Sequence, residues 1–163
     1  MAKLNIIADK IRDVGRKAVL VAMIIMTPVV FVNVVARYLF NVSLPWSPEV
    51  ARYSFVWITF LGTAIALREN SHAKISLLIE ATPQNIQKVL KLVNYIIMVG
   101  LCILLITTGI KQAIDVWPTK AAYMRFLSMG WMYLSIPICG LLMLFFTCVS
   151  IVELISNEKG LDK

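Results

Sequence analysis

The residues that could carry chemistry gather at the two ends of one apolar segment, residues 46–72. The charged or titratable members of this segment are Glu49, Arg52, Arg68, Glu69 and His72. A carboxylate inside a membrane can relay protons, and a glutamate clustered with a histidine can serve an enzyme at a membrane face. Glu49, however, lies at the start of the segment beside Arg52, whereas a proton-coupled exporter needs its acid at mid-depth. The pattern therefore predicts charges that mark the ends of a span.

Other catalytic or cofactor-binding patterns are absent from the sequence. A single histidine excludes a bis-histidine haem within one chain and disfavours a metal site. No nucleophile motif, Walker loop or glycine-rich dinucleotide fingerprint occurs. Cys102, Cys139 and Cys148 lie in apolar segments without a CxxC spacing, which is typical of buried free thiols. We therefore predict no catalytic, cofactor or metal residues in this chain, and no enzyme.

The composition indicates an integral membrane protein. Of 163 residues, 60% are hydrophobic and only 15% are charged, and the mean hydropathy is +0.81. Four apolar stretches, at about 18–38, 49–67, 92–112 and 127–153, each approach the roughly 20 residues that cross a bilayer. The first is too long for a signal peptide and lacks a cleavage site, so we expect it to be retained. The predicted fold is all-α, with four transmembrane helices in a single membrane domain, 1–163.

The distribution of basic residues predicts the orientation. The N-terminal tail, the middle connection and the C-terminal tail carry eleven lysines and arginines, and the other side carries five. By the positive-inside rule both termini face the cytoplasm. The net charge of +7 then indicates contact with phospholipid head groups, and nothing suggests nucleic acid.

Two segments have an amphipathic pattern. Residues 4–19 alternate apolar and basic positions at helical spacing, which fits either an interfacial helix or the lower end of the first span. Residues 75–91 repeat the pattern, with Thr82 and Pro83 placed to start a helix. We expect this second segment to lie on the membrane surface or to form a collar around the spans.

The second span combines a charged start with a small-residue face. Glu49 and Arg52 stand three residues apart, so they can pair with each other, reach a partner or lipid, or snorkel to the interface. Further along, Gly62 and Ala66 form a small-xxx-small pair that allows another helix to approach closely. We interpret this face as a packing surface.

The second span, with its flanks, resembles the small membrane subunit of tripartite ATP-independent periplasmic (TRAP) transporters, the DctQ-like or Q subunit. The resemblance covers about residues 18–152. Its central motif comprises Arg37, Tyr38, Phe40, Trp46, Ser47, Glu49, Arg52, Tyr53, Phe55, Val56, Trp57, Phe60, Leu61, Gly62, Ala66, Leu67, Arg68 and His72. It continues in Leu77, Leu78, Pro83, Gly130, Trp131, Tyr133 and Pro137. One position departs from the family pattern, because Ser76 stands where an acidic residue often precedes the paired leucines.

The resemblance implies a scaffold in the bacterial inner membrane rather than a transport site. In that family a large, elevator-type membrane subunit carries the substrate and sodium sites, and a periplasmic binding protein delivers an organic acid. The small subunit would form a heterodimer with the large one and need no cofactor of its own. Candidate contacts with that partner or with lipid are Trp46, Glu49, Arg52, Trp57, Gly62, Ala66, Arg68 and His72. Lys111, Lys120 and Arg125 are candidates for docking the binding protein, or ordinary solvated charges.

Two other functions are alternatives to this one. A self-contained multidrug-type exporter acting as a homodimer would need a mid-membrane acid, and a small membrane enzyme would need more than the Arg68, Glu69 and His72 group. Uptake by the chain alone would separate these possibilities from a scaffold. The substrate, whether a C4-dicarboxylate, sialic acid or another carboxylate, cannot be predicted from a subunit that is not expected to touch it.

Overall fold

The computed structural model describes residues 2–70 and 84–161, and most of these residues form helices. The elements are α1 (Ala2–Leu39), α2 (Ser47–Asn70), α4 (Gln84–Asp115), α5 (Gly130–Tyr133) and α6 (Ser135–Leu161). Four stretches are long and apolar enough to cross a membrane: Leu4–Leu39, Ser47–Glu69, Val93–Asp115 and Gly130–Val152. The predicted all-α membrane fold with four spans is confirmed.

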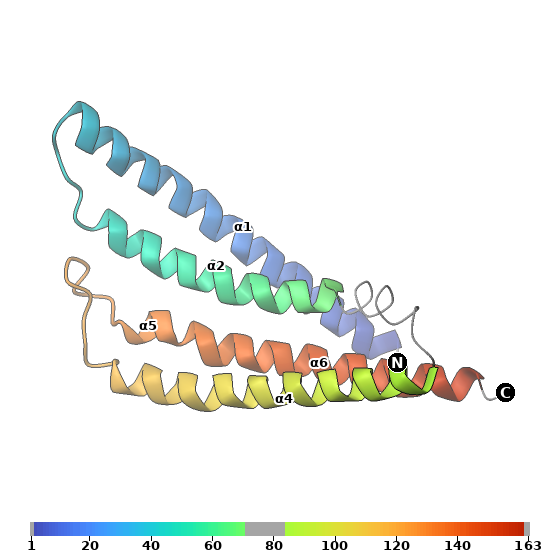
Figure 1. Ribbon diagram of the computed structural model, residues 1–163. Helices are drawn as coiled ribbons and strands as arrows, with labels where there is room; N and C mark the ends of the chain where they lie inside the picture. The colour runs from blue at the N-terminus through green and yellow to red at the C-terminus, as the bar shows by residue number, and fades with distance from the viewer. Residues whose placement is uncertain (1, 71–83, 162–163) are drawn as a thin grey trace.

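The four long helices form a row in the order α1, α2, α6, α4 (Figure 1). Neighbours in the row pack against each other, and the start of α1, which is inclined to the other helices, also contacts α6. Helices α1 and α4 lie at opposite edges. The connections 40–46 and 116–129 lie together at one end of the bundle, and the start of α1 and the end of α6 lie at the other. The side of the membrane that each end faces stays a prediction.

The first helix is longer than the predicted span. It has 38 residues, which corresponds to about 57 Å. The amphipathic segment 4–19 is continuous with the span, so it forms the lower part of the same helix and not a separate interfacial one. Of the predicted surface segment 75–91, residues 84–91 begin α4, and residues 75–83 lie outside the described part of the chain, as does His72.

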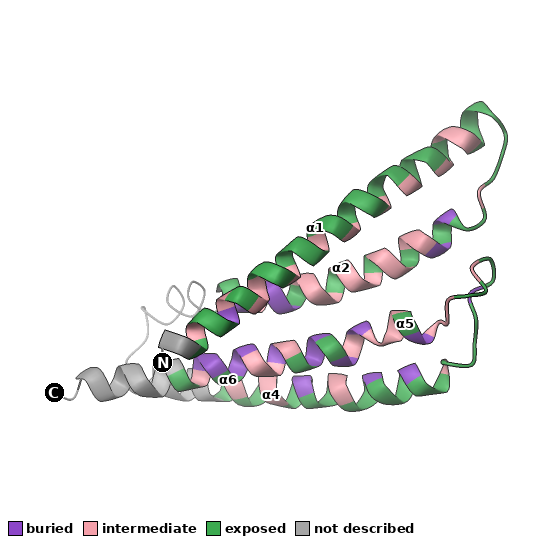
Figure 2. Ribbon diagram, turned by 180° about the vertical axis from the view of Figure 1, so that it is seen from behind, coloured by how far each residue is buried: buried purple, intermediate pink, exposed green. Residues whose placement is uncertain are grey.

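The buried core is centred on α6. Half of the most apolar part of residues 130–152, which comprise α5 and the first part of α6, is buried, against none of the corresponding part of α1. One cluster joins Ala8 of α1 to Phe146 and Val149, and a second joins Ala64 of α2 and Cys102 of α4 to Met143. Figure 2 shows the same gradient, with buried residues gathered on α6 and mostly exposed residues along α1.

Glycines allow α4 and α6 to approach closely. A Cβ placed on Gly109 would lie 2.8 Å from Cδ of Pro137, and one on Gly140 would lie 3.0 Å from Cγ1 of Ile106. At Gly62 a Cβ would meet nothing within 4 Å. The close approach predicted at Gly62 is therefore not made within the described part of this chain, and a partner contact there stays a prediction.

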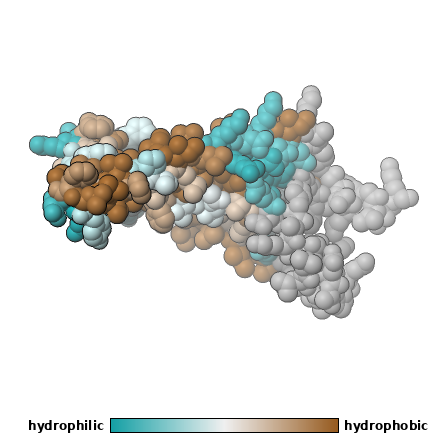
Figure 3. Space-filling model, turned by 90° about the horizontal axis from the view of Figure 1, so that it is seen from above, coloured by the Kyte–Doolittle hydropathy of each residue, from teal (hydrophilic) through white to brown (hydrophobic). Residues whose placement is uncertain are grey.

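The outer surface is apolar along the middle of the bundle. Figure 3 shows hydrophobic residues over the middle of one face, with hydrophilic patches on either side of them. Exposed large apolar residues include Val21, Ile24, Phe31, Ile97 and Leu104. Such residues face lipid or a membrane partner at no hydrophobic cost.

Candidate functional site

One face of α2 binds the segment that joins α4 to α6. Glu49, Tyr53 and Trp57 follow one another at four-residue intervals, so they lie on the same side of the helix. Each makes a hydrogen bond to backbone groups between Tyr123 and Trp131. We call this set the α2 ladder, and it is the candidate functional site of the chain.

Glu49 makes the strongest contact of the α2 ladder. Its Oε1 accepts a hydrogen bond from the N–H of Tyr123 at 3.0 Å, and its Oε2 accepts one from the N–H of Met124 at 2.9 Å. The residue is only 9% exposed. Charge-assisted hydrogen bonds are about twice as strong as neutral ones, and two donors satisfy one oxygen each. Glu49 therefore fixes the position of the connection 116–129.

Tyr53 and Trp57 extend the attachment toward α6. The hydroxyl of Tyr53 donates to the carbonyl of Ser128 at 3.1 Å, and Nε1 of Trp57 donates to the carbonyl of Trp131 at 3.2 Å. These bonds satisfy the polar atoms of two large aromatic side chains, as is usual when such residues are partly buried.

The bound connection is also folded on itself. The N–H of Ala121 donates to the carbonyl of Leu127, and the N–H of Met129 donates to the carbonyl of Thr119. Ser128 Oγ donates to the carbonyl of Trp117 at 2.6 Å and accepts from the N–H of Gly130 at 3.0 Å. The connection is a structured loop and not a loose tether.

Arg52 lies apart from this network. It is exposed, and among the described residues no ion pair joins it to Glu49. The carboxylate of Glu49 instead binds amides of its own chain, an arrangement that sequence reasoning missed. The only local pattern that could have predicted it is Glu49 followed, four and eight residues later, by Tyr53 and Trp57, which are aromatic side chains with a hydrogen-bond donor.

The start of α2 is attached to α1. Ser47 Oγ donates to the carbonyl of Val29 at 3.1 Å, and Oδ1 of Asn33 accepts from the N–H of Leu44 at 3.2 Å. Trp46, a predicted partner or lipid contact, is 41% exposed at this end. These bonds place the 40–46 connection against α1 and the beginning of α2.

At the opposite end of α2, Arg68 turns inward. It is only 3% exposed, and its Nη2 lies 3.5 Å from Oδ1 of Asp9 and 3.4 Å from Oδ1 of Asn5. Arg12 forms further ion pairs with Asp9 and Asp13. Arg68 thus contacts α1, because Asp9 lies beside it in the antiparallel helix pair, and its contact with the partner subunit or with lipid stays a prediction.

The predicted docking residues Lys111, Lys120 and Arg125 are all exposed. Lys120 and Arg125 belong to the connection that Glu49 holds, and Lys111 lies near the end of α4. In the same connection Tyr123 and Phe126 are 64% and 83% exposed. The structure therefore presents a basic and aromatic surface on a fixed loop.

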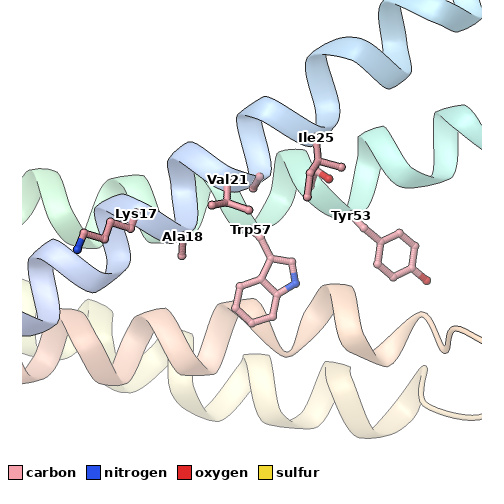
Figure 4. Close-up of a pocket in the computed structure, with 8 residues that line it drawn as sticks. Lys17, Ala18, Val21, Ile25, Tyr53 and Trp57 are labelled. Atoms are coloured by element: carbon pink, nitrogen blue, oxygen red, sulfur yellow. The ribbon is translucent and has the colours of Figure 1, made fainter.

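An open groove of about 490 Å³ runs between α1 and α2 (Figure 4). Its wall is mostly apolar and includes Ala18, Val21 and Ile25 of α1 and Trp57 of α2. Among the described residues, no cluster of three or more histidine, cysteine, aspartate or glutamate side chains could hold a metal ion. The arrangement supports attachment between segments, and it assembles no reacting groups.

The chain is a multi-pass membrane protein with four membrane-crossing helices. Its α2 ladder attaches α2 to the backbone of the segment that joins α4 to α6. Residues 26–157 match the family model described as the DctQ component of tripartite ATP-independent periplasmic transporters, and the chain belongs to this family. The resemblance found in the sequence is confirmed. The family is one of transporter subunits and not of enzymes. Together with the four apolar helices, membership of this family places the chain in the bacterial inner membrane.

The relatives carry TRAP transporter names. A putative TRAP transporter small permease protein of Haemophilus influenzae is 32% identical over 82% of this chain and 80% of its own length. A C4-dicarboxylate TRAP transporter small permease protein of Vibrio cholerae is 31% identical over 50% of this chain and 35% of its own length. The sialic acid TRAP transporter permease protein SiaT of H. influenzae is 27% identical over 72% of this chain, which covers 19% of SiaT. These names imply that TRAP small subunits work with a large permease subunit.

Proposed function

We propose that this chain is the stationary scaffold subunit of a sodium-coupled TRAP transporter that imports an organic acid. The observation that carries the proposal is the α2 ladder, which uses a buried carboxylate for attachment. A buried acid with both oxygens bound to fixed amides is poorly suited to exchange protons or to release a substrate. The transport and sodium sites then belong to the large subunit.

The held connection supports a second part of the proposal, docking of the periplasmic binding protein. Lys120 and Arg125 stand exposed on a loop that Glu49 fixes in place. A rigid basic surface steers an acidic partner and loses little entropy on binding. In this arrangement the end with the 116–129 connection faces the periplasm, and both chain termini face the cytoplasm.

Reconstitution tests the scaffold role. Proteoliposomes would receive this chain, the large subunit or both, with the binding protein and radiolabelled C4-dicarboxylate or sialic acid outside and an inward sodium gradient. We expect uptake only when both membrane subunits and the binding protein are present. Uptake by this chain alone would overturn the proposal and favour a self-contained transporter.

Charge reversal tests the docking surface. The double variant Lys120→Glu with Arg125→Glu should slow association of the binding protein by about tenfold or more at low salt, because electrostatic steering contributes factors of about 10–1,000 to on-rates. Lys10→Glu, an exposed lysine on the other end of α1, is the matched control. The association rate is measured on the complex embedded in nanodiscs. An equal decrease in the double variant and in the Lys10→Glu control would contradict docking at this loop.

A further inference from the structure

Contacts along the row establish which residues of the outer helices share a level. A Cβ placed on Gly15 of α1 would lie 3.3 Å from Cδ1 of Ile65 in α2. The adjacent Ala64 shares a buried cluster with Cys102 of α4. Gly15 and Cys102 therefore lie at nearly the same height along the bundle axis, on opposite edges of the row.

Two exposed lysines lie close to this level. Lys17 is two residues beyond Gly15, and Lys111 is nine residues beyond Cys102, both toward the end with the 40–46 and 116–129 connections. Their heights differ by seven residues, which is about 10 Å along the axis. The hydrocarbon core is about 30 Å thick, so in an upright bundle the two lysines cannot reach opposite membrane surfaces. They could share one surface only if the apolar stretch of α4 that precedes Lys111, within Val93–Asp115, lay outside the core; otherwise one exposed charge lies inside the core, which is costly.

We propose that the row of helices lies obliquely in the bilayer, leaning in its own plane, so that Lys17 reaches one phosphate layer and Lys111 the other. Up to three interaxial steps of about 8–10 Å separate α1 from α4, so a lean of about 30° adds up to about 14 Å between the two edges along the membrane normal. The lysines are then up to about 22 Å apart along the normal, and their side chains snorkel the remaining distance. A lean of about 30° lies within the range of known helix tilts.

Aromatic residues at the other end of α1 support the same lean. Tyr38 is 79% exposed and lies 23 residues beyond Gly15, whereas Trp117 is 48% exposed and lies 15 residues beyond Cys102. In an upright bundle Tyr38 lies up to about 12 Å higher than Trp117, the value for parallel helices, whereas Figure 1 shows α1 inclined to α4. The proposed lean lowers the α1 edge relative to the α4 edge and so brings the two rings closer to one level. Tyrosine and tryptophan favour the membrane interface, so a common level is the expected arrangement.

Depth measurements on matched pairs of positions test the proposal. Each pair joins two exposed residues of equal height, one on α1 and one on α4. Thr27 and Ile114 lie twelve residues above the common level of Gly15 and Cys102, and Val14 and Leu101 lie one residue below it. Single cysteines at these four positions, in the full chain with its three native cysteines replaced by alanine, would carry spin labels in liposomes.

An oblique row gives opposite contrasts in the two pairs. The ratio of collisions with oxygen to collisions with a water-soluble nickel chelate should be severalfold higher at Thr27 than at Ile114. It should be severalfold higher at Leu101 than at Val14. Equal ratios within each pair would overturn the proposal, because they would show an upright bundle.

The unsubstituted chain provides a second measurement that does not depend on the cysteine replacements. Polarised infrared spectroscopy of oriented bilayers reports the mean helix tilt. We expect a mean tilt of about 30°, and a value below about 15° would contradict the oblique orientation. Because this inference depends only on the membrane fold, it can fail while the scaffold role stands, and the reverse also holds.

Discussion

Glu49 shows how one buried side chain can position a segment far along the chain. Its two oxygens bind consecutive amides 74 and 75 residues away, in the connection between α4 and α6. Consecutive N–H groups that point the same way form a natural site for an anion. The chain thus supplies its own anion to a loop that would otherwise leave these donors to water.

Removing the carboxylate should loosen the loop and lower stability. Glu49→Ala leaves the amides of Tyr123 and Met124 without their acceptor, and we expect a loss of about 1.5–3 kcal/mol, the usual range for hydrogen bonds to charged groups. Thermal unfolding in detergent and limited proteolysis of residues 116–129 measure the effect. Arg52→Ala is the matched control, expected within about 0.5 kcal/mol of wild type. Equal losses in the two variants would indicate that the charges act as a pair after all.

The contact between Arg68 and Asp9 makes a second residue-scale prediction. Asp9→Asn removes the charge that faces the buried guanidinium, but Asp9 is 45% exposed and the separation is 3.5 Å. Solvent screening therefore limits the expected loss to about 1 kcal/mol. Asp13→Asn, which affects only the exposed pair with Arg12, should change the melting temperature less. A larger loss of stability in Asp13→Asn than in Asp9→Asn would contradict the prediction that Asp9 attaches α1 to α2.

At the scale of elements, two glycines mark a close helix contact between α4 and α6. Gly109 and Gly140 lie at this contact and leave no free space for a side chain. In a membrane, where lipid is as apolar as leucine, close backbone approach and van der Waals packing drive helix association. The pair α4–α6 therefore packs with its backbones close together, and the apolar part of α1 is the least buried of the four.

A methyl group at this contact should separate the two helices. Gly109→Ala places a Cβ within 3.0 Å of both Pro137 and Ile136, and overpacking of this kind costs about 1–3 kcal/mol. Gly62→Ala is the control, since it meets open space and gains helix propensity of up to about 1 kcal/mol. Melting temperatures in detergent give the comparison. A variant at Gly109 as stable as wild type would show that the α4–α6 contact can relax freely.

At the scale of the whole molecule, polar side chains of α2 make hydrogen bonds or ion pairs within the chain, whereas the exposed outer faces of α1 and α4 are apolar. The described side chains of Glu49, Tyr53, Trp57 and Arg68 bind groups of the same chain. The outer faces of α1 and α4 offer apolar side chains, and Gly62 offers a small one. A chain with this division holds itself together and leaves its apolar faces for lipid and, in the proposed complex, for a large membrane subunit.

The open space at Gly62 makes a prediction about the partner. Gly62→Leu should leave the melting temperature of the isolated chain unchanged, because no atom within 4 Å opposes a Cβ there. If Gly62 packs against the large subunit, the same change should reduce co-purification severalfold. Thr63→Leu, at a neighbouring exposed position, is the control. Undiminished co-purification of the Gly62 variant would remove this residue from the proposed interface.

The amino-acid sequence by itself determined the membrane class, the four spans, the absence of catalytic motifs and the family. These features depend on local hydropathy, on helix signals and on a dense motif within 46–72, and each can be recognised without knowledge of what lies beside it. The sequence also located the ends of α2, because charge avoids the hydrocarbon.

Only the tertiary structure decided which groups meet. Glu49 could have paired with Arg52 by spacing alone, yet it binds amides of Tyr123 and Met124, and Arg68 lies against Asp9 of another helix. Gly62 carried the recognised packing motif, whereas Gly109 and Gly140 make the close contact. Partners in a helix row depend on which faces turn toward each other, and that choice is a property of all four helices packed together.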